Sequence, residues 1–159
     1  MKNFQGKNIL FFSAAFFNYE KAIVEKLQNL GANVDYFNER PSDSTLAKGM
    51  IRVNRSLYKR KIQNYYQNIL DKTREKMYDF LLIIKGETVP DFFLKQFKII
   101  HPKTKLIYYG YDPLSEYPEI LKILPYFDKK LSFDREDAVK FQMQFRPLFF
   151  IDEYINKEN

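Results

Sequence analysis

Short apolar runs alternate with longer amphipathic stretches along the chain, and this alternation most constrains the fold. The first, third and fourth runs are almost continuously apolar, which is typical of strands covered on both faces. Since helical patterns separate the runs, the sequence predicts an α/β fold: a doubly wound, mainly parallel sheet of about six strands with helices on both faces. The expected strands are Asn8–Ser13, Asn33–Phe37, Asp79–Ile84, Lys105–Tyr109, Lys129–Phe133 and Pro147–Phe150.

Boundary residues locate the intervening helices. Asn18 is expected to cap the first helix, and Gly31 to end it. A long helical stretch over about 45–76 precedes the third strand, and Pro90 opens the next helix. Asp134 is expected to cap the last helix, with a carboxylate three residues on as a weak capping-box match.

Length and composition indicate a single domain, and the alternating pattern makes it one Rossmann-like domain spanning residues 1–159. The chain has no cysteine, so disulfides, thiolate metal sites and a cysteine nucleophile are excluded. The apolar run from Ile9 to Phe17 is too short to span a bilayer and is interpreted as a buried strand entering a helix. We therefore expect a cytoplasmic protein.

The net charge of +6 is concentrated between Ser44 and Leu70, a segment with six basic residues and no acidic one. Four of these side chains fall on one helical stripe, at i, i+4, i+7 and i+11. The simpler interpretation is a solvated helix face. The alternative is a surface that docks a protein partner or the anionic inner face of a membrane. The four residues are Lys48, Arg52, Arg55 and Lys59.

Ligands of open parallel sheets bind beyond the carboxyl ends of the strands, so the residues after each strand are the candidates for a site. The first such loop offers Ser13 and Asn18 but lacks a dinucleotide or phosphate-loop motif. The small residues of this loop would allow the backbone to approach a ligand closely, or would allow the helix to pack closely on the sheet. Lys85, Gly86 and Glu87 follow the third strand; Gly86 permits a positive φ, and Glu87 is a candidate proton acceptor or sugar ligand. The alternative is a Lys–Glu pair within a turn.

Polar and aromatic residues also follow the fourth and fifth strands. Tyr109 and Tyr111 are candidate sugar-stacking residues, and Asp112 is a candidate base, although an Asp-Pro turn is an equal alternative. Arg135 at a helix start is a candidate anion contact. The sole histidine, His101, lies away from these loops, and neither metal-ligand spacing nor a serine-triad motif is present. Nucleic-acid binding is disfavoured because no recognised motif accompanies the basic charge.

Several segments, taken in order, resemble the N-terminal half of bacterial capsule and lipopolysaccharide glycosyltransferases, the CgeB-like proteins of GT-B type. They are KNILFFSAAFFNYEKAIVEKLQNLGANVDYFNER, DFLLIIKGE, KLIYYGYD, LSFDREDAVKF and RPLFFIDEY. The resemblance implies an acceptor-side lobe, with a C-terminal lobe that binds the nucleotide-sugar donor and would begin where this chain stops. It places Lys85, Gly86, Glu87 and Asp112 on the cleft between lobes. Asp112 departs from the family pattern, since a proline follows it instead of serine.

Two function classes follow. The first is a glycosyltransferase lobe in cell-surface polysaccharide biosynthesis, acting on a sugar or lipid-linked glycan acceptor when a C-terminal lobe or partner subunit completes it. In an inverting reaction Glu87 or Asp112 would deprotonate the acceptor hydroxyl. No cofactor is evident beyond a nucleotide-sugar donor. The alternative is a non-catalytic module that docks through the basic helix, so the sequence does not decide whether the chain is an enzyme.

Overall fold

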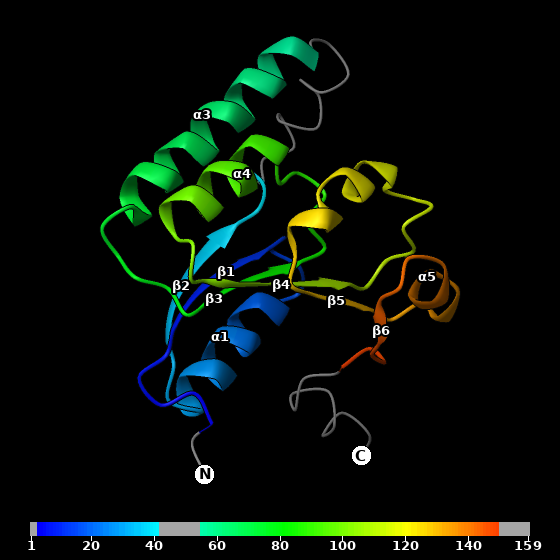
Figure 1. Cartoon of the computed structure of the whole chain (residues 1–159), viewed down its shortest axis with the longest axis horizontal. Coiled ribbons are helices and arrows are strands. Elements are labelled where there is room, and N and C mark those ends of the chain that lie inside the picture. The colour runs from blue at the N-terminus through cyan, green and yellow to red at the C-terminus, as the bar shows by residue number, and fades with distance from the viewer. Residues whose placement is uncertain (1–2, 42–54, 150–159) are drawn as a thin grey trace.

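A six-stranded parallel sheet forms the centre of the molecule. The computed structural model describes residues 3–41 and 55–149, apart from the side chains of 55–57. Within these residues the strand order is β2-β1-β3-β4-β5-β6, and every neighbouring pair is parallel (Figure 1). This confirms the predicted Rossmann-like α/β fold. The strands are β1 (Asn8–Ser13), β2 (Asn33–Asn38), β3 (Phe80–Ile84), β4 (Lys105–Gly110), β5 (Lys129–Ser132) and β6 (Gln144–Phe145).

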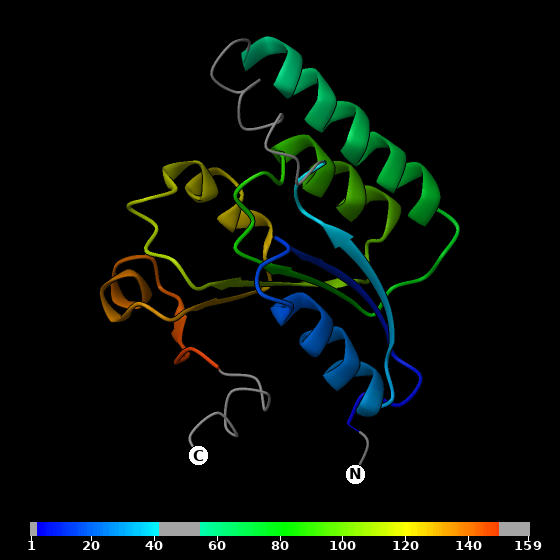
Figure 2. The same cartoon turned by 180° about the vertical axis from the view of Figure 1, so that it is seen from behind.

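Helices cover both faces of the sheet. Helix α1 lies on one face, whereas α3, α4 and two 3₁₀ helices lie on the other, as the two opposite views show (Figure 1 and Figure 2). Helix α5 packs against β5 and β6 at the edge. The helices are α1 (Tyr19–Asn29), α3 (Arg55–Thr73), α4 (Asp91–Ile100), α5 (Arg135–Lys140), η1 (Pro118–Lys122) and η2 (Leu124–Tyr126).

The strand order reverses between β1 and β3. From β1 the chain passes to β2 on one side, and the later strands then add on the other side. Ligands of such sheets bind at the carboxyl ends of the strands beside this reversal. The residues that follow β1 and β3 are therefore at the favoured position for a site.

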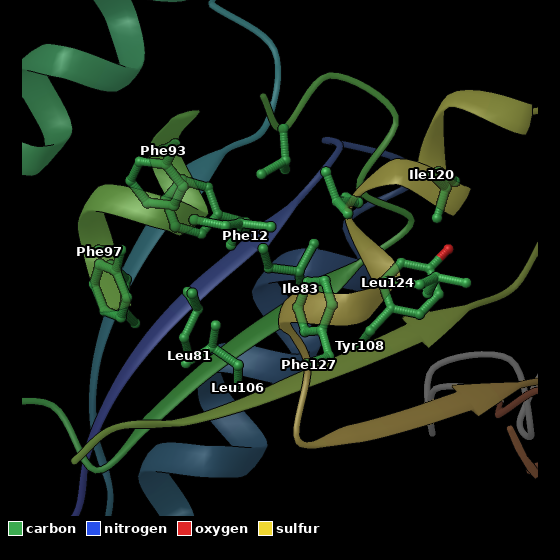
Figure 3. Packing of buried hydrophobic residues seen from close by; sticks show 14 of the residues in the cluster. Phe12, Leu81, Ile83, Phe93, Phe97, Leu106, Tyr108, Ile120, Leu124 and Phe127 are labelled. Atoms are coloured by element: carbon green, nitrogen blue, oxygen red, sulfur yellow. The ribbon is translucent and has the colours of Figure 1, made fainter. Parts of the chain in front are cut away.

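The larger core lies between the sheet and the α3–α4 layer. Alternate strand residues point into it, among them Phe12, Leu81 and Tyr108 (Figure 3). The ring of Phe12 contacts those of Tyr66 and Phe93, with centroids 5.8 and 5.3 Å away. The intervening residues of the strands face α1 in a second, smaller cluster. Two buried faces explain why the central strands are apolar throughout.

The sixth strand is the one strand prediction that the structure contradicts. It was expected over Pro147–Phe150, but β6 is Gln144–Phe145, and residues 147–149 are not in a strand. Phe150 lies outside the described residues. The ladder with β5 ends at Arg146, whose N–H donates to the Ser132 carbonyl at 2.8 Å. Pro147 has no N–H with which to extend it.

Two of the expected helix caps differ in detail. Asn18 occupies the N-cap position of α1 as predicted, but its φ is +62° and its side chain makes no capping hydrogen bond. The Glu20 carboxylate instead accepts the Phe16 N–H at 3.1 Å. Asp134 does cap α5, accepting from the Asp137 N–H at 2.8 Å. The Asp137 carboxylate binds the Leu114 N–H instead of closing a capping box.

The long helix before β3 is described from Arg55 to Thr73, and its expected start at 45–54 lies outside the described residues. Within the described part of the chain, no helix combines the length and hydropathy needed to cross a bilayer.

Candidate functional site

Charged side chains from three connections meet at the carboxyl edge of the sheet. Glu39 and Arg40 follow β2, Lys85 and Glu87 follow β3, and Asp112 follows β4. Because the strands are parallel, these connections leave the sheet at the same edge. We refer to these five residues as the carboxyl-edge cluster. It includes the three charged residues that the sequence singled out together, namely Lys85, Glu87 and Asp112.

Ion pairs join four members of the cluster in a row. The Lys85 Nζ lies 2.9 Å from Asp112 Oδ2 and 3.7 Å from Glu87 Oε2. The Arg40 guanidinium lies 2.7 Å from the same Glu87 oxygen and donates a hydrogen bond to it. Acidic and basic groups therefore alternate along the edge. Such a row presents both hydrogen-bond donors and acceptors to a polar ligand.

Lys85 is the centre of this row, and only 14% of its side chain is exposed. Its Nζ also donates to the Tyr117 hydroxyl at 3.2 Å and lies 4.5 Å from the centre of that ring. Burial opposes the charge, but the hydrogen bonds to Asp112 and Tyr117 outweigh it and raise the pKa of Lys85. Lys85 is therefore a fixed cation that orients carboxylates and does not serve as a base.

The backbone after β3 has an unusual conformation at two successive residues. Lys85 has a φ of +74° and Gly86 a φ of +76°. The sequence suggested that Gly86 permits a positive φ, and its φ is positive. A Cβ on Gly86 would also lie 3.1 Å from Ile83 Cγ2 and 3.3 Å from Tyr108 Cε2, so little room is left for a side chain. Positive φ at a non-glycine residue costs about 1 kcal/mol or more and is concentrated at functional sites.

Glu39 is the buried member of the cluster, with no exposed surface. Its backbone N–H donates to the Ser13 carbonyl at 3.1 Å, and its own carbonyl accepts hydrogen bonds from the hydroxyls of Tyr66 and Thr88. Neither carboxyl oxygen has a hydrogen-bond partner among the described residues. These backbone bonds fix a carboxyl group beneath the ion pairs.

Burial raises the pKa of Glu39 from 4.5 to about 7, and the neighbouring Glu87 charge adds to the effect. Arg40, the Gly86 N–H and Lys85 act in the opposite direction. The charge of Glu39 in the folded protein therefore depends on pH in the neutral range, because its pKa lies there. The sequence reasoning missed Glu39 and Arg40, although their position directly after β2 carried the same signal as the loops that were considered.

A separate apolar cavity of about 170 Å³ lies on the α1 side of the same edge. Ser13 and Tyr111, two of the predicted ligand-binding residues, line it, while the ion-paired side chains lie outside it. Burial raises the pKa of Tyr111, whereas Lys85 and a hydrogen bond with Ser13 lower it. Tyr111 therefore lies between the cavity and the carboxyl-edge cluster. The cavity is lined by Ser13, Phe16, Tyr19, Ile23, Ile84, Tyr111, Leu148 and Phe149.

The other predicted site residues lie apart from the cluster. Tyr109 belongs to the core on the α1 face, and its hydroxyl donates to the Pro147 carbonyl at 3.1 Å. Asn18 is exposed before α1. Arg135 begins α5, and its guanidinium lies 4.4 Å from the centre of the Phe145 ring.

The predicted basic stripe is described only in part. Arg55 begins α3, and Lys59 is exposed on it. Lys48 and Arg52 lie outside the described residues.

No group of three or more His, Cys, Asp or Glu side chains within 3–41 and 55–149 has an arrangement that could hold a metal ion. Comparison with protein-family models, with curated proteins and with solved structures finds no match. The chemistry of the carboxyl-edge cluster is thus the basis for the functional interpretation.

Proposed function

We propose that the carboxyl-edge cluster binds a hydroxyl-rich ligand, and that the domain is the acceptor-side lobe of a sugar-transferring enzyme in polysaccharide biosynthesis. The observation that carries the proposal is the convergence of Lys85, Glu87 and Asp112 beside the reversal in strand order. Sugar hydroxyls both donate and accept hydrogen bonds, so alternating carboxylates and cations complement them. Tyr117 supplies an aromatic face beside Lys85.

In an inverting transfer, a carboxylate of the lobe would take the proton of the acceptor hydroxyl. Asp112 and Glu87 are the candidates, because both are partly exposed, at 30% and 33% of their side chains. Lys85 and Arg40 would position them. The nucleotide-sugar donor would bind a C-terminal lobe or partner subunit, as the resemblance of the ordered segments implies.

The test measures binding of methyl β-D-glucopyranoside and related methyl glycosides to the full chain by saturation-transfer NMR. We expect binding to weaken about tenfold in Glu87→Gln and Asp112→Asn, since each removes a charged hydrogen-bond acceptor. Glu119→Gln is the matched control, because Glu119 is exposed and pairs only with Lys122 among the described residues. The proposal fails if no glycoside binds, or if all three variants bind as the wild type does.

If a complementing donor lobe is supplied, the same two variants test the chemistry. If one of these carboxylates is the required base, the variant that neutralises it should strongly lower the rate of sugar transfer. Full transfer activity in both Glu87→Gln and Asp112→Asn would show that neither carboxylate is that base.

A second function, docking on the anionic inner face of a membrane, is favoured by one observation on α3. Lys59, Arg60 and Lys61 are exposed in succession, and none of them has an ion pair among the described residues. Basic residues near an anionic surface contribute about 1 kcal/mol each, and salt screens the attraction.

Co-sedimentation with phosphatidylserine and phosphatidylcholine vesicles tests this function. Binding should require the anionic lipid, weaken with salt and fall in a variant in which Lys59, Arg60 and Lys61 become Gln. Equal binding to both vesicle types, or to neither, would exclude it.

A further inference from the structure

We propose that the apolar cavity on the α1 side of the sheet binds one aromatic ring of the ligand, so that the ligand is an aryl glycoside or a similar aryl-bearing polyol. The sugar portion of this proposal rests on the proposed function. The aryl portion rests on the cavity alone. Three features of the cavity carry it: its size, its aromatic wall and its position beside the carboxyl-edge cluster.

The size of the cavity fits a single ring. Its volume is about 170 Å³. Apolar cavities of about 150 Å³ in proteins remain dry and accept benzene.

The wall of the cavity is aromatic and comes from three separate segments. Phe16 lies in the β1–α1 connection, Tyr19 begins α1, and Phe149 follows β6. The rings of Tyr19 and Phe149 meet edge to face, with centroids 5.9 Å apart. Phe16 is 54% exposed and Phe149 39% exposed, so both leave apolar surface open to a ligand. Edge-to-face and offset contacts with a bound ring are favourable at these separations.

Tyr111 connects the cavity to the carboxyl-edge cluster. It lines the cavity together with Ser13, and Asp112 directly follows it in the chain. Asp112 in turn is paired with Lys85. A ring held in the cavity would therefore direct a hydroxyl-bearing substituent toward the cluster.

The test compares three probes with the full chain by ligand-observed NMR: phenol, phenyl β-D-glucopyranoside and methyl β-D-glucopyranoside. Burial of a phenyl ring predicts that the phenyl glucoside binds about tenfold or more tightly than the methyl glucoside. Phe16→Ala should remove most of this advantage by opening the wall. Ile23→Phe should also remove it by filling the cavity from α1.

Leu121→Ala is the control for Phe16→Ala, because it also truncates an exposed apolar side chain. Leu121 is 38% exposed, lies in η1 and is not part of the cavity wall. This variant should keep the preference for the phenyl glucoside.

The probes separate this inference from the proposed function. Binding of phenol that is lost in Ile23→Phe supports the aryl site even if the methyl glucoside does not bind. The inference is overturned if phenol and the phenyl glucoside bind no better than the methyl glucoside. It is also overturned if Phe16→Ala and Ile23→Phe both leave the preference unchanged.

Discussion

Replacing Glu39 with glutamine removes an ionisable group from beneath the carboxyl-edge cluster while keeping its shape. In the wild type, burial raises the pKa of Glu39 from 4.5 to about 7. Between these pH values the folded state keeps a proton that the unfolded state releases. The free energy of unfolding contributed by Glu39 therefore falls as pH rises through this window and stays low above it. Each unit of pKa shift corresponds to about 1.4 kcal/mol, so the free energy of unfolding should fall by roughly 3 kcal/mol between pH 4.5 and about pH 7.

Glu39→Gln should abolish this dependence. At about pH 5 both side chains are neutral, so the two proteins should differ by about 1 kcal/mol or less. At about pH 8 the variant should be the more stable by roughly 3 kcal/mol, because the glutamine never ionises.

Urea unfolding at several pH values from 4.5 upward measures the difference directly. Glu119→Gln, at an exposed position, should stay within about 0.5 kcal/mol of the wild type throughout. A difference between wild type and Glu39→Gln that does not change with pH would refute the assignment of Glu39 as a buried carboxyl titrating near neutrality.

Three further predictions concern stability and are checked by urea unfolding at a fixed pH. Gly86→Ala should lower the free energy of unfolding by about 2 kcal/mol, and by more than Gly6→Ala, because both have a positive φ but only Gly86 has side chains within 4 Å of a new Cβ. An equal loss in both would contradict the close contact. Asp134→Ala should cost about 1 kcal/mol through the lost α5 cap; no loss would show that the cap is dispensable. Phe12→Ala should lower the free energy of unfolding by about 3–5 kcal/mol, because its ring packs against Tyr66 and Phe93. A loss below about 1 kcal/mol would contradict this packing.

Part of the site could be predicted because parallel strands place their carboxyl ends at one edge. That rule alone puts Lys85, Glu87 and Asp112 together without any knowledge of packing. A positive φ at Gly86 was also anticipated as one option, because glycine permits that conformation.

The burial of Glu39 could not be predicted from local sequence. It depends on Tyr66 of α3 and on Thr88 after β3, whose hydroxyls bind the Glu39 carbonyl from segments far along the chain. The placement of Tyr109 in the core on the α1 face could have been predicted. Neighbouring residues of a strand face opposite sides of the sheet, and Tyr108 lies in the core on the α3–α4 face. The hydrogen bond of Tyr109 to Pro147 could not, since it needs the path of the chain after β6.

The position of the sixth strand was predicted wrongly for a similar reason. Leu148 and Phe149 are apolar and suggested a strand, but they line the cavity beside α1. Apolar pattern alone does not separate a strand from an extended segment that covers a pocket.

The most direct test of the central claim is a map of backbone amide shifts when methyl β-D-glucopyranoside is added to the full chain. A sugar bound at the carboxyl-edge cluster predicts concentration-dependent shifts at Gly86, Glu87 and Asp112, and their loss in Asp112→Asn. Shifts confined to other surfaces, or no shifts at any tested concentration, would contradict the claim that this edge of the sheet binds sugars.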